Sequence, residues 1–342
     1  MRPSFFHHLH PPTIPSKQSR WRYTLGAGGT AIFLVLVLIV TGTLEMFYYI
    51  PTPENAPLTV QTISYLVPFG GLVRNLHFWS AQLLLIVTSI HLVRVVFTGS
   101  YAPPRRFNYL LGLALFVLAI LLDFSGYVLR WDTGIQWALV TGTNLIKTIP
   151  IVGGTLYGAL IGGSEPGPAT LIRFYALHIF GLMLPTAFLV GWHAFRVRRD
   201  GGIAVAPPNL HSDNARITRF ELVRREILAM IFTSSALLLL SIFLPAPIAA
   251  PIQGIPALSG TATAPWFFLW VQQMLKWGDP FLWGVVVPLC VLLILALFPF
   301  VFPRPAVHEL GSWFPKSNRL AQITLGVIAI MIILLSLLAN VH

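Results

Sequence analysis

The chain alternates long hydrophobic runs with short polar connections. An apolar run of about 20 residues is enough to cross the roughly 30 Å hydrocarbon core of a bilayer as a helix. Seven runs reach this length, at residues 26–49, 75–98, 108–129, 171–196, 222–244, 281–302 and 319–339. We therefore predict an all-α integral membrane protein with seven transmembrane helices.

Composition and charge agree with a membrane location. Of the 342 residues, 56% are hydrophobic and 10% are charged, whereas soluble proteins are about 25% charged. The net charge of +11 would suggest a nucleic-acid partner in a soluble chain, but most of the 22 Lys and Arg residues fall in connections on one side of the predicted bundle. That side is expected to be cytoplasmic, with the N-terminus inside. The partner is then the lipid bilayer rather than nucleic acid, in a bacterial cytoplasmic membrane or an equivalent energy-transducing membrane.

Two of the predicted helices carry histidine pairs at matched spacing. The second run contains His77 and His91, fourteen residues apart, and the fourth contains His178 and His193, fifteen apart. At about 100° per residue, these steps return to within roughly 40° and 60° of the starting direction, so each pair lies on one helix face. Two such helices side by side would form two His–His clamps, stacked about 21 Å apart along the axis.

The chemistry of these clamps favours iron. Imidazole suits iron, and a haem iron held between two axial histidines is saturated, which favours electron transfer over oxygen chemistry. The alternative is that each histidine is a hydrogen-bonded core residue, but four buried histidines in two matched pairs within lipid favour a functional role. The chain has one cysteine, Cys290, inside an apolar run, so neither a disulfide nor a cysteine-bound iron–sulfur site is expected.

Glycines repeat the histidine period on two other predicted helices. Gly28 and Gly42 are fourteen residues apart on the first run, as are Gly112 and Gly126 on the third. Small residues in membrane helices commonly let another helix approach closely. A flat macrocycle clamped between helices also needs glycine where it meets a backbone, and the matching period favours this second interpretation.

The connections divide the chain into two parts. The basic connection at 197–221 separates a four-helix part with all four paired histidines from a three-helix part with none. We predict a boundary that gives parts 1–205 and 206–342. The long connections 130–170 and 245–280 lie on the outer side, where they are expected to cover a cavity, because long loops in a compact chain are usually functional.

Several motifs resemble one known family. They are TGTLEMFYYIP, RNLHFWSA, HLVRVVFTG, GYVLRWD and LIRFYALH. On these motifs, residues 20–205 resemble the chloroplast-type, four-helix cytochrome b of the quinol:cytochrome c and plastoquinol:plastocyanin oxidoreductases. Residues 215–340 are similar to the separate three-helix subunit that partners that form, here fused.

The resemblance implies two non-covalent haem b groups, one near the outer side between His77 and His178 and one near the inner side between His91 and His193. It also implies a dimeric complex with other subunits, a quinol cavity under the two long outer connections, and a quinone site beside the inner haem.

Four arginines are candidate cofactor-binding residues. Arg74 and Arg94 lie at the two membrane faces, where they are placed to pair with haem propionates. The alternative for each is simple snorkelling at a membrane end. Arg173 lies at the outer entry of the fourth span, and Arg198 matches a basic position of the family's inner quinone site.

The chain departs from the family at two motifs. Thr24 replaces the cysteine that attaches an extra haem in the chloroplast-type protein, so no covalent haem is expected. The family's PEWY motif aligns with residues 264–267, where its glutamate is absent and Trp266 is retained as a candidate quinone contact. We predict Asp123 and Glu45 as proton acceptors in its place. The alternatives are that Asp123 bonds a buried partner such as a tryptophan N–H, or that the outer site is inactive.

Taken together, these features predict a redox subunit, rather than a complete enzyme, that moves electrons between a quinone or quinol and a partner such as a Rieske protein or a c-type cytochrome. A second hypothesis is a non-bifurcating, quinone-reactive membrane anchor of a periplasmic multihaem cytochrome or dehydrogenase complex. A third is a non-redox proton channel or transporter whose histidines conduct protons.

Overall fold

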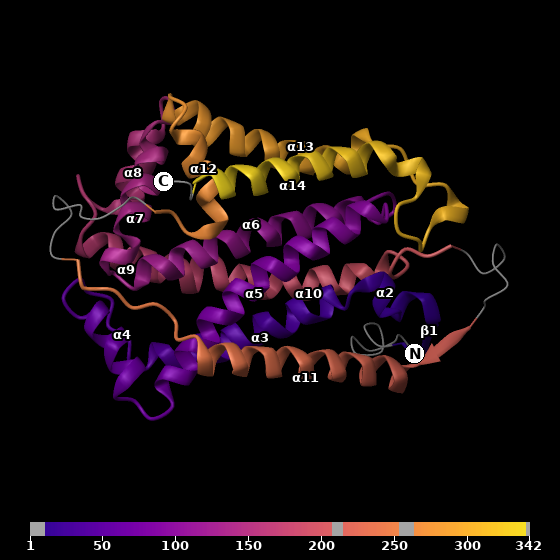
Figure 1. The fold of residues 1–342 in the computed structure, drawn as a ribbon, viewed down its shortest axis with the longest axis horizontal. Helices are drawn as coiled ribbons and strands as arrows, with labels where there is room; N and C mark the ends of the chain where they lie inside the picture. Colours follow the sequence, from indigo (N-terminus) through magenta and orange to yellow (C-terminus); the bar gives the residue numbers. More distant parts are fainter. Residues whose placement is uncertain (1–10, 207–214, 253–262, 340–342) are drawn as a thin grey trace.

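The structure is a computed structural model, and it describes residues 11–206, 215–252 and 263–339 (Figure 1). Within these residues, seven helices are long and apolar enough to cross a membrane, which confirms the predicted fold class. They are Ala27–Met46 (α3), Gly70–Phe97 (α5), Arg106–Leu129 (α6), Pro168–Arg199, Arg219–Phe243 (α11), Leu282–Val301 and Lys316–Ala339.

Three of these spans are composite. The fourth consists of α9 (Pro168–Ala176), a π-helical segment η2 (Leu177–Met183) and α10 (Leu184–Arg199). The sixth joins a π-helical segment η5 (Leu282–Val286) to α13 (Val287–Val301), and the seventh joins η7 (Lys316–Asn318) to α14 (Arg319–Ala339).

The second span begins at Gly70, before its predicted start at 75. Gly70 and Gly71 pack under the last turn of α4 (Ala56–Tyr65). An added Cβ would lie 2.2 Å from the carbonyl oxygen of Ile63 at Gly70 and 2.7 Å from that of Ser64 at Gly71. Because glycine has no Cβ, the helix can start directly against this neighbour.

The spans form one bundle with a helical cap at one end (Figure 1). Among the first four spans each contacts the next one along the chain, α11 lies along α3 and α5, and the last two spans pack against α6 and α5 from the other side. Short helices gather at the end opposite the strand Thr13–Pro15 (β1): α4, α7 (Thr133–Lys147) and α8 (Gly153–Ile161). Nearby, η4 (Trp266–Phe268) and α12 (Leu269–Leu275) precede the sixth span.

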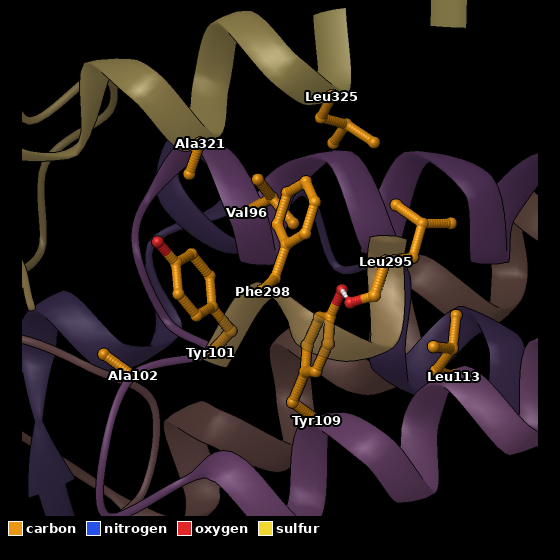
Figure 2. Close-up of a cluster of buried hydrophobic side chains, with 9 residues drawn as sticks. All are labelled: Val96, Tyr101, Ala102, Tyr109, Leu113, Leu295, Phe298, Ala321 and Leu325. Atoms are coloured by element: carbon orange, nitrogen blue, oxygen red, sulfur yellow. Dashed lines mark hydrogen bonds between the residues drawn. The ribbon is translucent and has the colours of Figure 1, made fainter. Parts of the chain in front are cut away.

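A buried cluster joins the last two spans to the first four (Figure 2). Tyr109 on α6 donates to the carbonyl of Leu295 at 2.8 Å, and the Tyr101 hydroxyl donates to Asn318 Oδ1 at 2.5 Å. Asn318 in turn donates to the carbonyl of Val96 at 2.8 Å. The remaining members are Ala102, Leu113, Phe298, Ala321 and Leu325. Fully burying a large apolar side chain contributes about 1.5–3 kcal/mol, so this cluster holds the three-helix part to the bundle.

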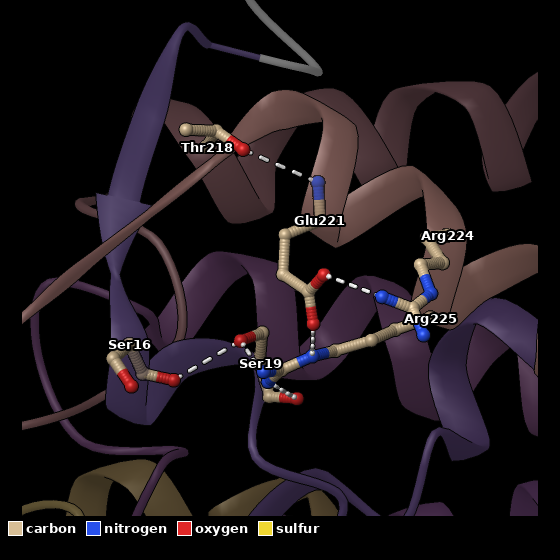
Figure 3. Close-up of polar contacts among 6 residues, drawn as sticks. All are labelled: Ser16, Ser19, Thr218, Glu221, Arg224 and Arg225. Atoms are coloured by element: carbon tan, nitrogen blue, oxygen red, sulfur yellow. Dashed lines mark hydrogen bonds and ion pairs between the residues drawn. The ribbon is translucent and has the colours of Figure 1, made fainter.

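A small sheet fixes the N-terminal segment to the start of α11. Strand β1 (Thr13–Pro15) pairs antiparallel with β2 (Arg216–Thr218). About two turns into α11, Arg225 binds the carboxylate of Glu221 at 3.1 Å and donates to Ser19 Oγ at 2.9 Å (Figure 3). These contacts tie the two parts predicted on either side of residue 205 together, while the boundary itself stays a prediction.

Candidate functional site

The structure brings the two histidine pairs together across two helices. The rings of His91 on α5 and His193 on α10 face each other with centroids 6.5 Å apart and planes at 80°. A metal–imidazole bond is about 2.0–2.1 Å, and the ring centroid lies roughly 1.2 Å behind Nε2, so two imidazoles sharing one metal have centroids about 6.4 Å apart. The spacing of this pair therefore suits a single metal ion between them.

A π-turn corrects the uneven spacing of the second histidine helix. His178 lies within η2, and Pro185 follows near the start of α10. Proline has no N–H to donate to the preceding turn, and an i→i+5 turn holds one residue more than an α-turn. Fifteen residues across this segment therefore behave approximately like fourteen in a regular helix, which brings His193 into register with His178.

Hydroxyl groups orient the rings of His77 and His178. Thr41 Oγ1 donates to the carbonyl of Val37 at 2.8 Å and lies 2.9 Å from His77 Nδ1. Ser125 Oγ donates to a carbonyl of its own helix at 3.0 Å and lies 2.8 Å from His178 Nδ1. Each hydroxyl has used its proton, so it accepts from Nδ1–H, and Nε2 is left unprotonated. Metal-ligating histidines are held in this way by a partner on the other ring nitrogen.

The other pair has no hydroxyl partner among the described residues, and His193 lies instead near the backbone of Asn108. Among the described residues, no side chain accepts a hydrogen bond from Nδ1 of His91 or His193. The two clamps therefore place their histidines in different polar surroundings.

Each of the four predicted glycines lies against one of the four histidines. The distances from an added Cβ to the histidine Cε1 are 2.9 Å for Gly42 and His77, 3.0 Å for Gly112 and His193, 3.3 Å for Gly126 and His178, and 3.5 Å for Gly28 and His91. Only the Gly42 distance is below 3.0 Å, where an added side chain forces a shift, whereas at Gly112 and Gly126 the histidine ring would have to move by a few tenths of an ångström. The glycines and the histidines thus share one spacing because each glycine packs against one histidine ring.

One apolar cavity lies between these helices. His77, His178, Gly42 and Gly126 line it, together with aliphatic and aromatic residues from α3, α5, α6 and the fourth span. The described residues contain no cluster of three or more His, Cys, Asp or Glu side chains that could hold a bare metal ion. A haem iron needs only two protein ligands, and the histidine pair, the glycine contacts and the apolar lining fit such a group.

The two arginines predicted to bind propionates differ in their contacts. Arg74 lines the cavity but donates to the carbonyls of Ala246 and Pro247 at 3.1 and 2.7 Å. Arg94 donates from Nε to the Tyr23 carbonyl at 3.2 Å and lies over the Tyr23 ring. One terminal nitrogen of Arg94 is buried without a partner among the described residues. Such a nitrogen fits an anionic group of a cofactor, because an unpaired buried charge is costly.

The other predicted arginines lie at the ends of the fourth span. Arg173 donates to the carbonyls of Gly158 and Ala159, the last turn of α8. Arg198 is half-buried near the end of α10, within electrostatic range of Glu226 on α11. Their roles in cofactor binding stay predictions.

Both predicted proton acceptors line the cavity. One carboxylate oxygen of Glu45 is buried without a hydrogen-bond partner among the described residues. Asp123 accepts from Gln82 Nε2 at 3.0 and 3.3 Å, and Gln82 Oε1 accepts from the Trp266 indole at 2.7 Å. Sequence reasoning missed Gln82; its signal was a polar residue in an apolar run, five positions after His77.

The segment that replaces the PEWY motif packs through aromatic rings. Phe267 lies 6.2 Å from Tyr127 and Phe268 lies 5.8 Å from Phe124, both in edge contacts with α6. Aromatic pairs of this geometry stabilise by about 0.5–1.5 kcal/mol beyond their burial. The segment is therefore held firmly against the helix that carries Asp123.

Comparison with known proteins agrees with this arrangement. The model of the Cytochrome b/b6/petB family matches residues 13–201. A cytochrome b6 of Heliobacterium mobile is 38% identical over 192 residues, covering 56% of this chain and 88% of that protein. A cytochrome b6 of Gracilaria tenuistipitata var. liui is 37% identical over 174 residues, covering 51% of this chain and 81% of that protein.

A solved structure extends the likeness to the whole fold. A chain of a hyperthermophilic respiratory Complex III superimposes with a TM-score of 0.74 at 20% identity, covering 93% of this chain and 91% of that one. At this identity the match shows the fold alone, and it covers more of the chain than the family model does. The family model matches the spans that carry the histidines, and the cytochrome b6 relatives match the same part of the chain. This chain therefore belongs to the cytochrome b/b6 family.

Proposed function

We propose that this membrane cytochrome b holds two non-covalent haem b groups and moves electrons across the membrane between a quinone or quinol and a partner redox protein. The observation that supports this most strongly is the match of two histidine pairs with four glycine contacts. The haem groups would supply one-electron chemistry, and the histidines would hold them. His77 and His178 would bind one group, and His91 and His193 the other.

The residues around each clamp would have separate tasks. Thr41 and Ser125 would hold the first pair of rings with Nε2 free for iron. The buried nitrogen of Arg94 would pair with an anionic edge of the other group. The glycines would let the helices approach closely enough for the histidine rings to bind the iron.

We place the first pair towards the outer side and the second towards the cytoplasm, following the distribution of Lys and Arg. Quinone would react beside the second pair, near Arg198, and at the outer side near Trp266. Asp123 and Glu45 would accept quinol protons there, because a general base must lie within hydrogen-bond reach of the proton, directly or through one water.

The partner is a Rieske protein or a c-type cytochrome, within a dimeric membrane complex. The likeness to a chain of a respiratory Complex III supports membership of such a complex. A non-bifurcating anchor of a multihaem cytochrome or dehydrogenase complex is the second candidate. Pro265 in place of the motif glutamate favours it, because no carboxylate stands at that position. The subunit composition of the native complex distinguishes the two.

A haem assay of the purified chain tests the proposal. A pyridine haemochrome assay should give about two haem groups per chain, and His91→Ala should remove one of them. His308→Ala is the matched control, because His308 is exposed and distant in sequence from both clamps. One haem or none in the parent chain would overturn the proposal. The absence of a haem spectrum would instead favour a proton channel.

A further inference from the structure

Asp123 is a carboxylate held inside the bundle by an amide rather than by a cation. Its side chain is 7% exposed, and both oxygens accept from Gln82 Nε2 at 3.0 and 3.3 Å. Among the described residues it takes part in no ion pair. A buried charge is normally paired, so the bundle without a cofactor leaves this carboxylate without an opposite charge.

Trp266 determines which way the Gln82 amide points. An indole N–H can only donate, and it lies 2.7 Å from Gln82 Oε1. The amide oxygen is therefore on the Trp266 side and the NH₂ group on the Asp123 side. Gln82 is thus a positioning residue that holds Asp123 as an acceptor, and the segment 264–267 sets its orientation.

Asp123 lines the same cavity as His77 and His178. Six other charged or titratable groups face this cavity from the surrounding elements. They are Glu45 of α3, Tyr49 just after α3, Arg74 of α5, Tyr127 of α6, Arg130 just after α6 and Tyr175 of α9. The neighbouring elements α7, α13 and η4 contribute no residue to the lining.

Neither of the two arginines that line the cavity pairs with Asp123, and Arg74 lies within electrostatic range of Glu45. Arg130 binds Asp132 at 2.8 Å, and Arg74 donates to two carbonyls of the connection after α11. The missing positive charge is therefore expected from the cofactor. A ferric haem with two neutral axial histidines carries one net positive charge on its core, and the ferrous form carries none. In a water-poor interior this difference acts strongly on a nearby carboxylate.

We infer that Asp123 is the redox-linked proton acceptor of the haem held by His77 and His178. The Asp123 carboxylate would gain one proton and become a carboxylic acid when the bound haem gains one electron. The electron comes from a quinol, or from the chemical reductant in a titration, and the proton comes from water. This inference rests on the proposed function, but it does not require quinol to be oxidised at this side.

Potentiometric titration of the purified full chain, with its haem groups, over a series of pH values tests the inference. The midpoint potential of one haem should fall as pH rises, by up to about 59 mV for each tenfold fall in proton concentration. In Asp123→Asn this slope should disappear, and the potential should stay near its low-pH value because asparagine resembles the neutral acid. Glu54→Gln is the matched control, since it removes an exposed carboxylate that does not line the cavity, and it should keep the slope. Glu45→Gln tests the other carboxylate of the cavity.

Infrared difference spectra of the unaltered protein give a second measurement that does not depend on a variant folding. Reduction should produce the C=O band of a protonated carboxyl group, which shifts in D₂O. Any of four results would overturn the inference while the proposed function stands. They are a pH-independent potential, a slope that survives Asp123→Asn, a slope that only Glu45→Gln removes, and the absence of a carboxyl band. A chain without haem would overturn the proposed function instead.

Discussion

Replacing Gly42 by alanine tests whether glycine is needed at this position to leave room for the His77 ring. An added Cβ at Gly42 would lie 2.9 Å from His77 Cε1, which is too close for an unstrained contact. Gly28 offers a milder case, with 3.5 Å to His91 Cε1. Gly29 is the matched control on the same helix, because an added Cβ there meets nothing within 4 Å.

The expected magnitude follows from separating two effects of the added methyl group. Alanine favours a helix interior over glycine by about 1 kcal/mol, with or without cofactor, at all three positions. Overpacking costs about 1–3 kcal/mol, and at Gly42 it acts on the ring position needed for ligation. Since about 1.4 kcal/mol is tenfold, we expect haem affinity of the His77 and His178 pair to fall roughly 5- to 150-fold in Gly42→Ala.

Haem content under limited haem supply and the rate of haem transfer to apomyoglobin measure this effect. Gly42→Ala should lose one haem preferentially, Gly28→Ala should lose little, and Gly29→Ala should behave like the parent chain. The reasoning is refuted if Gly42→Ala retains both haem groups as firmly as Gly29→Ala.

Three further predictions concern other contacts. Thr41→Val and Ser125→Ala should each raise the midpoint potential of the haem bound by His77 and His178 by about 20–60 mV. The lost hydrogen bond, about 0.5–1.5 kcal/mol, makes the imidazole a weaker donor to Fe(III). Potentiometric titration measures both midpoint potentials, and that of the other haem should be unchanged. Asn318→Leu should destabilise the protein by about 1–3 kcal/mol by leaving the Tyr101 hydroxyl buried and unpaired, which a thermal unfolding assay in detergent measures, and an unchanged unfolding temperature would contradict it. Acid–acetone extraction should remove all haem, since Thr24 stands where the chloroplast-type protein attaches one; haem staining of the denatured band would contradict this.

Local patterns in the sequence were sufficient for the seven spans and for placing the paired histidines and glycines on their helices. Span length follows from the number of consecutive apolar residues, and face membership follows from the helical period, so both can be read without knowing any neighbour. The match of Gly42 with His77 and of Gly112 with His193 is the clearest case, because two helices share one spacing.

The tertiary structure determined features that the helical period of the sequence could not predict. Fifteen residues from His178 to His193 predicted a residual rotation of roughly 60° on a regular helix, and the π-helical segment before Pro185 makes this spacing approximately equivalent to the fourteen residues that separate His77 and His91. The strand pair β1 and β2 joins residues about two hundred positions apart in the sequence, so no local pattern announced it.

The polar network around Asp123 shows the same limit. The sequence marked Asp123 as a buried acid, but its partner Gln82 and the orientation of that amide depend on α5, α6 and η4 meeting at one point. Arg74, expected at a propionate, also donates to two carbonyls of a connection that crosses α5. Hydrogen-bond partners depend on which segments come within about 3 Å in space, and that distance is set by long-range packing rather than by the order of residues along the chain.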